Sequence, residues 1–317
     1  MITVLAGGVG AARFLRGLVA VHDPSDITAV VNTADDTVLH GLSISPDLDT
    51  VTYTLADAID PTRGWGLRDE SWRAMGALAR YTPQRPDGSN AGGTWFGLGD
   101  QDLATHMYRT ARLAEGATLA EVTREITAAW GLGLRIVPMT DDGVATMVTL
   151  ATGREVSFQE YFVGLRHDVA VASVRFAGAD TARPAPGVLD AIETAERIVI
   201  APSNPLVSIG PIRAVPGIDD ALRARRERTV AISPIVAGAA LKGPADRMLV
   251  ELGHDASVVG VARLYASICS TLIIDEADAA LVSAVEAEGL RCVVTDTIMR
   301  TPDVSAALAR RTLEPGR

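Results

Sequence analysis

Cysteine is nearly absent from this chain, and no long apolar run occurs in it. The 317 residues include two cysteines, Cys269 and Cys292, whose spacing fits neither a disulfide framework nor a zinc site, so both are expected to be reduced core residues. No apolar stretch approaches the ~20 residues that span a bilayer. Met1 leads into an apolar segment without a basic region, which is unlike a signal peptide. We therefore expect a cytoplasmic protein with no membrane partner.

An excess of positive charge is also lacking. The formal net charge is −10, and the sequence pI is about 5.0. An acidic protein repels phosphate backbones, so we expect no nucleic-acid partner. An anionic small molecule stays possible, because a bound metal ion can reverse the sign of the local charge.

Aromatic residues make up only 4% of the chain, so the core must be built from Ala, Val, Leu and Ile. Short apolar runs of this kind are typical of parallel strands that are buried on both faces. Residues 2–6 and 27–31 form two such runs, separated by a glycine turn and a helical pattern over 10–21, which predicts a parallel βαβ unit. Further strands are predicted at residues 197–201, 229–232, 271–275 and 291–294.

Helical patterns accompany these later strands, and a different middle region precedes them. The helices are predicted at residues 187–194, 218–225, 244–252, 258–266 and 278–288. We expect an α/β fold with a doubly wound, mostly parallel Rossmann-like sheet, built from residues 1–60 and 166–317. Residues 61–165 are expected to form a helical and loop-rich insertion. Its predicted elements are helices at 102–114 and 119–130 and a meander of short strands over 135–163.

Three glycines follow the first predicted strand and precede a helix. Gly7, Gly8 and Gly10 would let backbone N–H groups approach a phosphate, and Arg13 adds a cation one turn later. A nicotinamide site is disfavoured, because Arg13 replaces the third glycine of that motif and Asn32, not an acidic residue, follows the second strand. The segment also lacks the Gly-Lys-Ser/Thr ending of a Walker A loop. An anion site and a purely structural tight turn both stay open.

Four carboxylates occur shortly after the second predicted strand. Asp35 and Asp36 follow that strand directly, and Asp47 and Asp49 come next; we call residues 32–49 the acidic segment. Ligands of doubly wound sheets bind beyond the carboxyl ends of the strands, which is where this segment begins. Mg²⁺ prefers carboxylate oxygens, with substrate phosphates and water as its other ligands. Aspartate is also common in solvated turns and helix caps, but the nearby glycine turn favours a metal and phosphate site.

With these residues in view, the chain resembles the 2-phospho-L-lactate transferase (CofD) family, which acts in the biosynthesis of the deazaflavin coenzyme F-420. The resemblance extends over nearly the whole chain and rests on ten motifs in the same order. The motifs are GGVGAARFLRGL (7–18), NTADD (32–36), ISPDLDTV (44–51), GWGL (64–67), ES (70–71), WFGLGDQDLATH (95–106), PMTDD (138–142), FQEYFV (158–163), APSNPLVSIGPI (201–212) and SPIVAGAALKGPADRM (233–248).

The resemblance implies a reaction and its partners. A phosphorylated three-carbon acid (phosphoenolpyruvate, 2-phospholactate or 3-phosphoglycerate) would move from its guanosine diphosphate-linked donor to the ribityl hydroxyl of 7,8-didemethyl-8-hydroxy-5-deazariboflavin. Guanosine monophosphate (GMP) would leave. The resemblance also implies a magnesium requirement and a homodimer. The sequence does not specify the acid, because these acids differ by two hydrogens or one hydroxyl position.

The resemblance implies roles for individual residues as well. Asp35, Asp36 and Asp49 would hold Mg²⁺, and Asp36 and Asp49 would be catalytic, with Asp49 also facing the deazaflavin. Asp47 would shape only the turn. Residues that would meet the donor nucleotide or its phosphates are Gly7, Gly8, Gly10, Arg13, Asn32, Ser203, Asn204, Ser208, Gly210 and Lys242. Residues that would meet the deazaflavin, which the insertion would cover, are Asp49, Trp65, Trp95 and Gln101.

Bland interpretations of several of these residues stay open. Lys242 is equally typical of a solvated surface lysine, and Trp65, Trp95 and Phe96 are equally typical of ordinary packing. His106 fits a core histidine as well as a functional one. Gln101 departs from the family, which usually has an arginine at this place, so a phosphate or carboxylate contact there is in doubt.

Two other classes of function compete with the transferase. A sugar-nucleotide-binding regulatory protein of the related gluconeogenesis-factor branch would continue its Asp pair with a Gly-Gly-Ser-Ser run. Here Asp36 is followed by Thr-Val-Leu-His, and the PDLDT segment is present. A nicotinamide dehydrogenase is disfavoured by Arg13 and Asn32. The transferase is the preferred interpretation.

Overall fold

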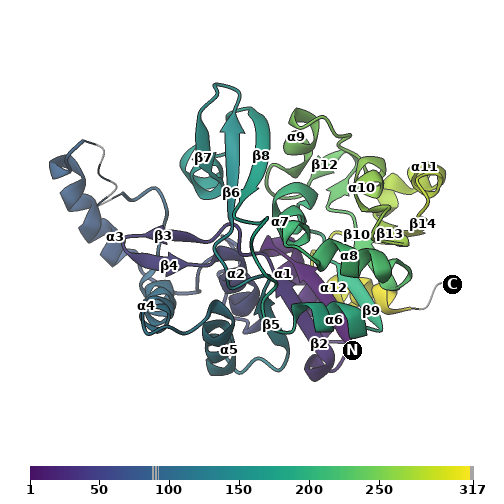
Figure 1. Ribbon diagram of the computed structural model, residues 1–317, viewed down its shortest axis with the longest axis horizontal. Coiled ribbons are helices and arrows are strands. Elements are labelled where there is room, and N and C mark those ends of the chain that lie inside the picture. The colour runs from purple at the N-terminus through teal and green to yellow at the C-terminus, as the bar shows by residue number, and fades with distance from the viewer. Residues whose placement is uncertain (88, 90, 92, 315–317) are drawn as a thin grey trace.

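A parallel sheet of seven strands forms the centre of the computed structural model, which describes residues 1–87, 89, 91 and 93–314 (Figure 1). All neighbouring strands pair in parallel, in the order β14-β13-β10-β9-β1-β2-β5. The strands are β1 (Ile2–Ala6), β2 (Ile27–Val31), β5 (Arg135–Pro138), β9 (Arg197–Ile200), β10 (Thr229–Ile232), β13 (Thr271–Ile274) and β14 (Arg291–Val294).

The strand order reverses once, between β1 and β9. The chain first moves outward from β1 through β2 to β5, and then returns to place β9 on the other side of β1. Leu5 pairs with Ile200 there, so the loops after β1 and β9 leave the sheet side by side. This is the strand order of a Rossmann-type sheet, whose ligand crevice lies at the reversal. The predicted fold class is confirmed.

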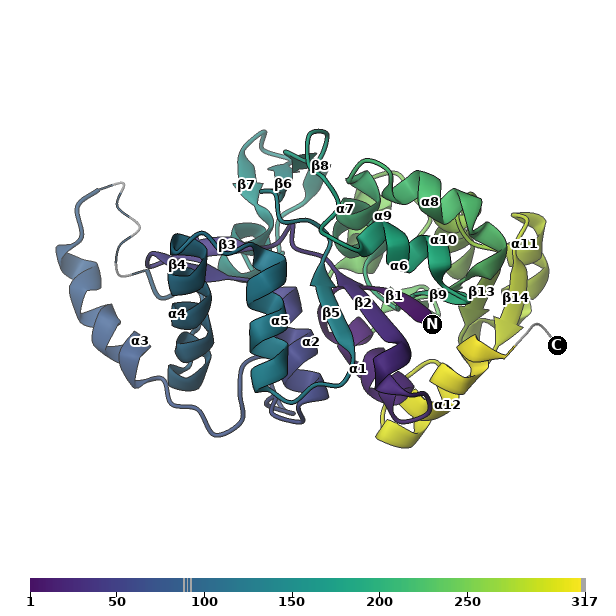
Figure 2. The same cartoon turned by 60° about the horizontal axis from the view of Figure 1, so that its bottom comes forward.

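Helices cover both faces of the sheet, which explains why its strands are apolar runs. Val4 of β1 packs on one side with the helices α1 (Gly8–Val19), α2 (Pro46–Leu55) and α12 (Pro302–Leu313). Leu5 packs on the other side. The helices on that side include α6 (Val188–Thr194), α7 (Gly210–Ala214), α8 (Ile218–Ala224), α10 (Val258–Tyr265) and α11 (Val282–Ala287). Figure 2 shows α12 below the sheet and α6, α8 and α10 above it.

The helices α1 and α12 approach closely at a glycine. A Cβ atom at Gly17 would lie 2.3 Å from the carbonyl carbon and oxygen of Ser305, so only glycine fits this contact. The contact ties the first helix of the chain to the last one. Among the residues that the structure describes, no helix is long and apolar enough to cross a bilayer.

The middle of the chain adds elements beside and above the sheet. In Figure 1 the hairpin β3–β4 and the helices α3 and α4 lie to the left of the central sheet, and a three-stranded antiparallel sheet rises above it. These elements are β3 (Thr37–Leu39), β4 (Leu42–Ile44), α3 (Arg73–Leu78), α4 (Asp100–Ala114), α5 (Leu119–Ala129), β6 (Ala145–Leu150), β7 (Glu155–Ser157) and β8 (Val171–Ala177). The remaining elements are β11 (Ile235–Val236), β12 (Ala239–Ala240) and α9 (Ala245–Glu251).

The predicted meander over residues 135–163 is wrong in its first strand. Arg135–Pro138 pairs in parallel with β2 and forms the edge of the central sheet, while the antiparallel sheet contains β6, β7 and β8. A four-residue apolar run has no periodicity that tells the two kinds of strand apart. The sheet thus takes one strand from the segment assigned to the insertion. The division into a core of 1–60 and 166–317 and an insertion of 61–165 otherwise stays a prediction.

Candidate active site

The glycine turn after β1 is bonded to the loop after β9. The Gly7 N–H donates to Ser203 Oγ at 3.3 Å, and the Ser203 hydroxyl donates to the Gly7 carbonyl at 2.8 Å. Gly8 has a φ of +70°, a left-handed conformation that strains other residues. The two loops therefore form one unit at the reversal of strand order.

Glycine is also required here by close packing. A Cβ atom at Gly10 would lie 2.3 Å from the Pro202 carbonyl oxygen, and one at Gly7 would lie 2.8 Å from Ser208 Cβ. Both predicted functions of the turn are compatible with this geometry. The bare backbone allows the two loops to meet, and the N-terminus of the 12-residue helix α1 begins at that place.

Asn32 joins two carboxylates of the acidic segment. The residue is fully buried at the end of β2, and its Nδ2 donates to Asp35 Oδ2 and to Asp47 Oδ2, both at 3.0 Å. Its Oδ1 accepts from the Ala34 N–H, which fixes the side chain. Asp47, expected only to shape a turn, is therefore a direct neighbour of Asp35. Asn32 has no donor group left for a ligand.

Burial and mutual repulsion act against the charges of these carboxylates. Burial raises the pKa of Asp35 well above its usual range, and the charge of Asp47 adds to the increase. Burial likewise raises the pKa of Asp36, whose Oδ2 accepts a hydrogen bond from Ser45 Oγ at 2.6 Å. Burial raises the pKa of Asp47 to about 6, although hydrogen bonds from Asn32 and the Gly8 N–H oppose it.

Asp35 and Asp36 each have one carboxylate oxygen without a hydrogen-bond partner in the described part of the chain. Oδ1 of both residues is buried and accepts no hydrogen bond of normal geometry from the described part of the chain, although the Thr146 hydroxyl lies near Asp35 and favours its charged form. Buried polar atoms without a partner are rare and call for an explanation such as a bound ion. A divalent cation would supply the missing partner and relieve the repulsion, so these residues fit a metal site.

Asp49 is in a different state, because a buried arginine satisfies it. Arg109 of α4 is 2% exposed, and its Nη1 donates to Asp49 Oδ2 at 3.1 Å while its Nη2 donates to Asp49 Oδ1. Burial opposes the charge on Arg109, but the Asp49 carboxylate outweighs it and raises the pKa of the guanidinium. Asp49 can coordinate a metal ion only if Arg109 releases one of its oxygens.

The pair continues into a buried ion network of Asp49, Tyr53, Asp102, His106 and Arg109. His106 Nδ1 lies 3.2 Å from Arg109 Nη1, and its Nε2 lies 3.2 Å from Asp102 Oδ2. Arginine can only donate, so Nδ1 accepts, and the ring proton is assigned to Nε2 on the Asp102 side. Tyr53 completes the network by donating to Asp102 Oδ1 at 2.8 Å.

The ion network also contains a geometric triad of metal-type ligands. Atoms of Asp49, Asp102 and His106 all lie within 4.8 Å of one another. The guanidinium of Arg109 already provides the positive charge that these groups require. The triad is therefore explained as part of the network.

Two cations lie at the rim of the glycine turn without a carboxylate partner among the residues described. Arg13 is exposed on α1, and Lys242 lies on the loop before α9. Burial and the charge of Arg13 lower the pKa of Lys242. Its Nζ lies 2.9 Å from the position of a Cβ atom at Gly64, which has a φ of +75°. Arg13 and Lys242 are thus neighbouring positive charges beside a loop that the insertion contributes.

The predicted deazaflavin residues lie on the insertion side. Trp65 is 44% exposed and Trp95 is 42% exposed, which is unusual for such large side chains and argues against ordinary core packing. Trp95 stands edge-on to Phe96, with ring centres 5.8 Å apart. Gln101 is exposed in the first turn of α4 and donates to the Arg68 carbonyl at 3.3 Å.

Two residues assigned to the donor have structural contacts instead. Asn204 Oδ1 accepts from the N–H groups of Leu206 and Val207 and caps the short helical turn over Pro205–Ile209. Gly210 faces the Phe176 ring, which would lie 3.0 Å from a Cβ atom there. A contact between the Asn204 oxygen and the donor nucleotide is therefore disfavoured. Other contacts of Asn204 and Gly210 with the nucleotide stay predictions.

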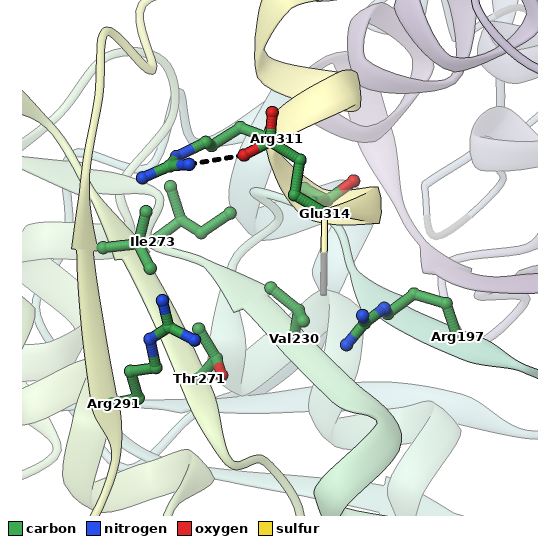
Figure 3. A pocket seen from close by; sticks show the side chains of 9 residues that line it. Arg197, Val230, Thr271, Ile273, Arg291, Arg311 and Glu314 are labelled. Carbon is green, nitrogen blue, oxygen red and sulfur yellow. Dashed lines mark hydrogen bonds and ion pairs between the residues drawn. The ribbon is translucent and has the colours of Figure 1, made fainter. Parts of the chain in front are cut away.

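A separate hollow lies at the opposite edge of the sheet, where β9, β10, β13 and β14 begin (Figure 3). Arg197, Arg291 and Arg311 surround its apolar floor, and Arg311 pairs with Glu314. Its volume of about 30 Å³ is far too small for a nucleotide. It lies at the amino ends of the strands and is not part of the site.

The partners of Asp49 were not predicted from the sequence, although a signal for them exists. Asp102, His106 and Arg109 are spaced by four and three residues, which places them on one face of α4. Three polar residues on a buried helix face indicate a network with a partner elsewhere. The acidic segment contains carboxylates that could be this partner, and Asp49 is the one that pairs with Arg109.

The comparisons with known proteins agree with this architecture. A solved structure of a UPF0052 family member from Bacillus halodurans matches with a TM-score of 0.62 and 17% identity, covering 99% of this chain and 98% of that one, which shows the shared fold. The phosphoenolpyruvate transferase of Streptomyces griseus is 45% identical over 99% of this chain and 97% of its own length. The phosphoenolpyruvate transferase of Kitasatospora aureofaciens is 44% identical over 98% and 96%. A family model described as 2-phospho-L-lactate transferase CofD matches residues 2–310. The chain therefore belongs to the CofD family of transferases.

Proposed function

We propose that this transferase moves phosphoenolpyruvate from a guanosine diphosphate-linked donor to the ribityl hydroxyl of the deazaflavin alcohol and releases GMP. The observation that carries the proposal is the pair of buried oxygens of Asp35 and Asp36 at the switch point of the sheet, which have no hydrogen-bond partner among the described residues. Phosphoenolpyruvate is chosen over the other acids because relatives that are 44–45% identical bear that name.

The chemistry requires positioning and charge neutralisation more than covalent help from the protein. The ribityl oxygen would bond to the phosphorus that carries the acid, the diphosphate anhydride bond would break, and GMP would take the bridging oxygen. The hydroxyl proton must leave during this step. Asp36 is a candidate acceptor, because its buried carboxylate lies beside the proposed metal position at the switch point of the sheet.

Different elements around the switch point would each hold one part of the substrates. The remaining N–H groups of the first turn of α1, together with Arg13 and Lys242, would meet the donor phosphates, because Arg13 and Lys242 have no carboxylate partner in the described part of the chain. The exposed ring of Trp65 would face the deazaflavin. The homodimer and the cytoplasmic location expected from the sequence stay predictions.

Magnesium is proposed as the cofactor, held by Asp35 and Asp36 through their free Oδ1 atoms. Asp47 is a third candidate, because its carboxylate shares the Asn32 amide with Asp35. Bound there, the ion would neutralise charge on the diphosphate. Asp49 is retained as the residue that holds Arg109 beside Asp36, and a direct ligand role for it is the alternative.

One experiment tests the proposal directly. The protein is incubated with the deazaflavin alcohol, Mg²⁺ and, in separate reactions, the guanosine diphosphate-linked form of each of the three acids, and the products are weighed by mass spectrometry. We expect the phosphoenolpyruvyl product together with GMP, and no product when EDTA is present. Preference for another acid would change the substrate, and absence of product with every donor would overturn the proposed function.

A further inference from the structure

An arginine lies behind the exposed tryptophan of the insertion. The Arg63 guanidinium carbon lies 5.3 Å from the ring centre of Trp65 and 4.8 Å from that of Trp72. The two indoles stand edge to face, 5.8 Å apart. A guanidinium at this distance attracts both rings. Arg63 therefore restrains Trp65 from the protein side, while the remaining part of the indole faces solvent.

Carboxylates and a carbonyl hold Arg63 in this place. Its Nη2 lies 3.0 Å from Glu70 Oε1, 3.2 Å from Asp60 Oδ2 and 3.0 Å from the Leu67 carbonyl oxygen. The Leu67 N–H donates back to Glu70 Oε1 at 3.2 Å. Arg63 thus closes a ring of contacts within the loop that carries Trp65.

Glu70 connects this loop to α4. Its side chain is fully buried, and burial raises its pKa. A Cβ atom at Gly66 would lie 2.4 Å from Glu70 Oε1, and one at Gly99, which precedes α4, would lie 1.8 Å from Glu70 Oε2. Only glycines leave room for the carboxylate at both places. Burying a carboxyl group lowers the free energy of unfolding unless hydrogen bonds and ion pairs compensate for the lost hydration. The burial of Glu70 between two glycines and Arg63 therefore indicates that its position has a purpose.

A third glycine lies against the two indoles. A Cβ atom at Gly97 would lie 3.2 Å from the Trp72 ring and 3.3 Å from the Trp65 ring. The backbone at Gly97 therefore lies directly against the two indoles. Trp65 is thus packed by Arg63, Trp72 and the Gly97 backbone, while 44% of it stays exposed. An exposed, immobilised aromatic ring is suited to stacking against a flat ligand, because little freedom is lost on binding.

We propose that Arg63 and Glu70 are positioning residues that hold Trp65 as a preformed stacking surface for the aromatic ring of the acceptor. The inference deepens the proposed function and rests on it. Arg63 and Glu70 contact neither substrate. They act by fixing the indole. The Arg63 guanidinium is held within the loop by its ion pairs with Glu70 and Asp60.

The test is direct binding of the deazaflavin alcohol, measured by titration calorimetry without donor or metal. We expect Trp65→Ala, Glu70→Gln and Arg63→Met each to raise the Kd by about tenfold, which is in the range for loss of one stacked ring. Arg63→Lys keeps the charge and should recover part of the affinity. The matched control is Glu155→Gln, which breaks an exposed arginine pair with Arg175 far from the loop and should leave the Kd unchanged.

Kinetics separate positioning from a general loss of structure. The Glu70 and Arg63 variants should raise the KM for the acceptor and leave the KM for the donor unchanged, with a circular dichroism spectrum like that of wild type. Wild-type affinity of Glu70→Gln and Arg63→Met beside a weakened Trp65→Ala would overturn the positioning role. Wild-type affinity of Trp65→Ala would overturn the stacking surface. Failure of the unmodified protein to transfer to any acceptor would instead overturn the proposed function.

Discussion

The two ends of the acidic segment contain the same residue type in opposite states. Asp35 and Asp36 each keep a buried oxygen that has no partner in the part of the chain that the structure describes, whereas both oxygens of Asp49 bind one guanidinium. The sequence alone does not distinguish the four aspartates of the segment, since all lie within a short span at the carboxyl edge of the sheet. The difference arises from α4, which reaches Asp49 and does not satisfy the other two. Whether a buried carboxylate can bind a ligand therefore depends on whether a cation from a neighbouring helix already satisfies its oxygens.

The largest expected effect comes from removing the cation behind Asp49. Arg109→Met should lower the free energy of unfolding by about 3–5 kcal/mol, because it leaves a buried carboxylate without a counter-charge. Urea denaturation followed by circular dichroism measures this change. Arg175→Met, which breaks the exposed pair with Glu155, is the control and should cost less than about 1 kcal/mol. Equal costs for the two variants would show that Asp49 does not depend on Arg109.

The next largest effect should come from the opposite end of the segment. Asp35→Asn keeps the shape of the side chain and should reduce kcat/KM by about 100-fold, together with weaker Mg²⁺ binding in calorimetry. Its metal-free melting temperature should equal or exceed that of wild type, because repulsion with Asp47 is removed. Asp303→Asn, on the exposed first turn of α12, should leave activity unchanged. An active Asp35→Asn enzyme with normal Mg²⁺ affinity would remove this residue from the metal site.

Asp49→Asn decides between the two roles of that residue. A direct ligand predicts lost Mg²⁺ binding and lost transfer in a protein of normal stability. The ion pair predicts lower stability with Mg²⁺ affinity within about threefold of wild type, since Asp35 and Asp36 are retained. We expect the second result, and calorimetry together with urea denaturation distinguishes it from the first.

The smallest expected effect is a dependence of stability on pH. The pKa of Asp47 is about 6 in the folded protein, above its value of about 3.9 in an unfolded chain. The folded state therefore binds more protons in this interval, and stability falls as the pH rises from about 4 through 6. Relative to Asp47→Asn, the melting temperature of wild type in EDTA should decline over that range. Excess Mg²⁺ should reduce the decline. An identical pH dependence in wild type and Asp47→Asn would contradict the buried state of Asp47.

Much of the sheet was predictable because its strands are buried on both faces. Ile2–Ala6 and Ile27–Val31 are uninterrupted apolar runs, and both appear in the structure with the predicted bounds. Arg135–Pro138 was assigned to the wrong sheet, since pairing partners are not encoded in a four-residue run. The rule that ligands bind at the carboxyl edge favoured the glycine turn and the acidic segment, and both follow strands at that edge of the sheet.

The rest of the site depends on contacts between distant parts of the chain. Asp49 and Arg109 are 60 residues apart, so no local pattern pairs them. The spacing of His106 and Arg109 indicates a shared helix face, but it does not reveal what that face meets. Glu70 was recognised only as part of a short motif. Its contacts with Gly66 and Gly99 join segments about 30 residues apart, which no local pattern encodes.

The bond between Gly7 and Ser203 has a consequence for the order of folding. These residues are separated by 196 positions, so a ribosome must synthesise most of the chain before the loop after β9 can meet the glycine turn. Local βαβ pairing can form early, but closing so long a loop is slow. The carboxylates of the acidic segment are thus made long before the second wall of their crevice exists. Catalytic competence should be among the last properties that the newly made chain acquires.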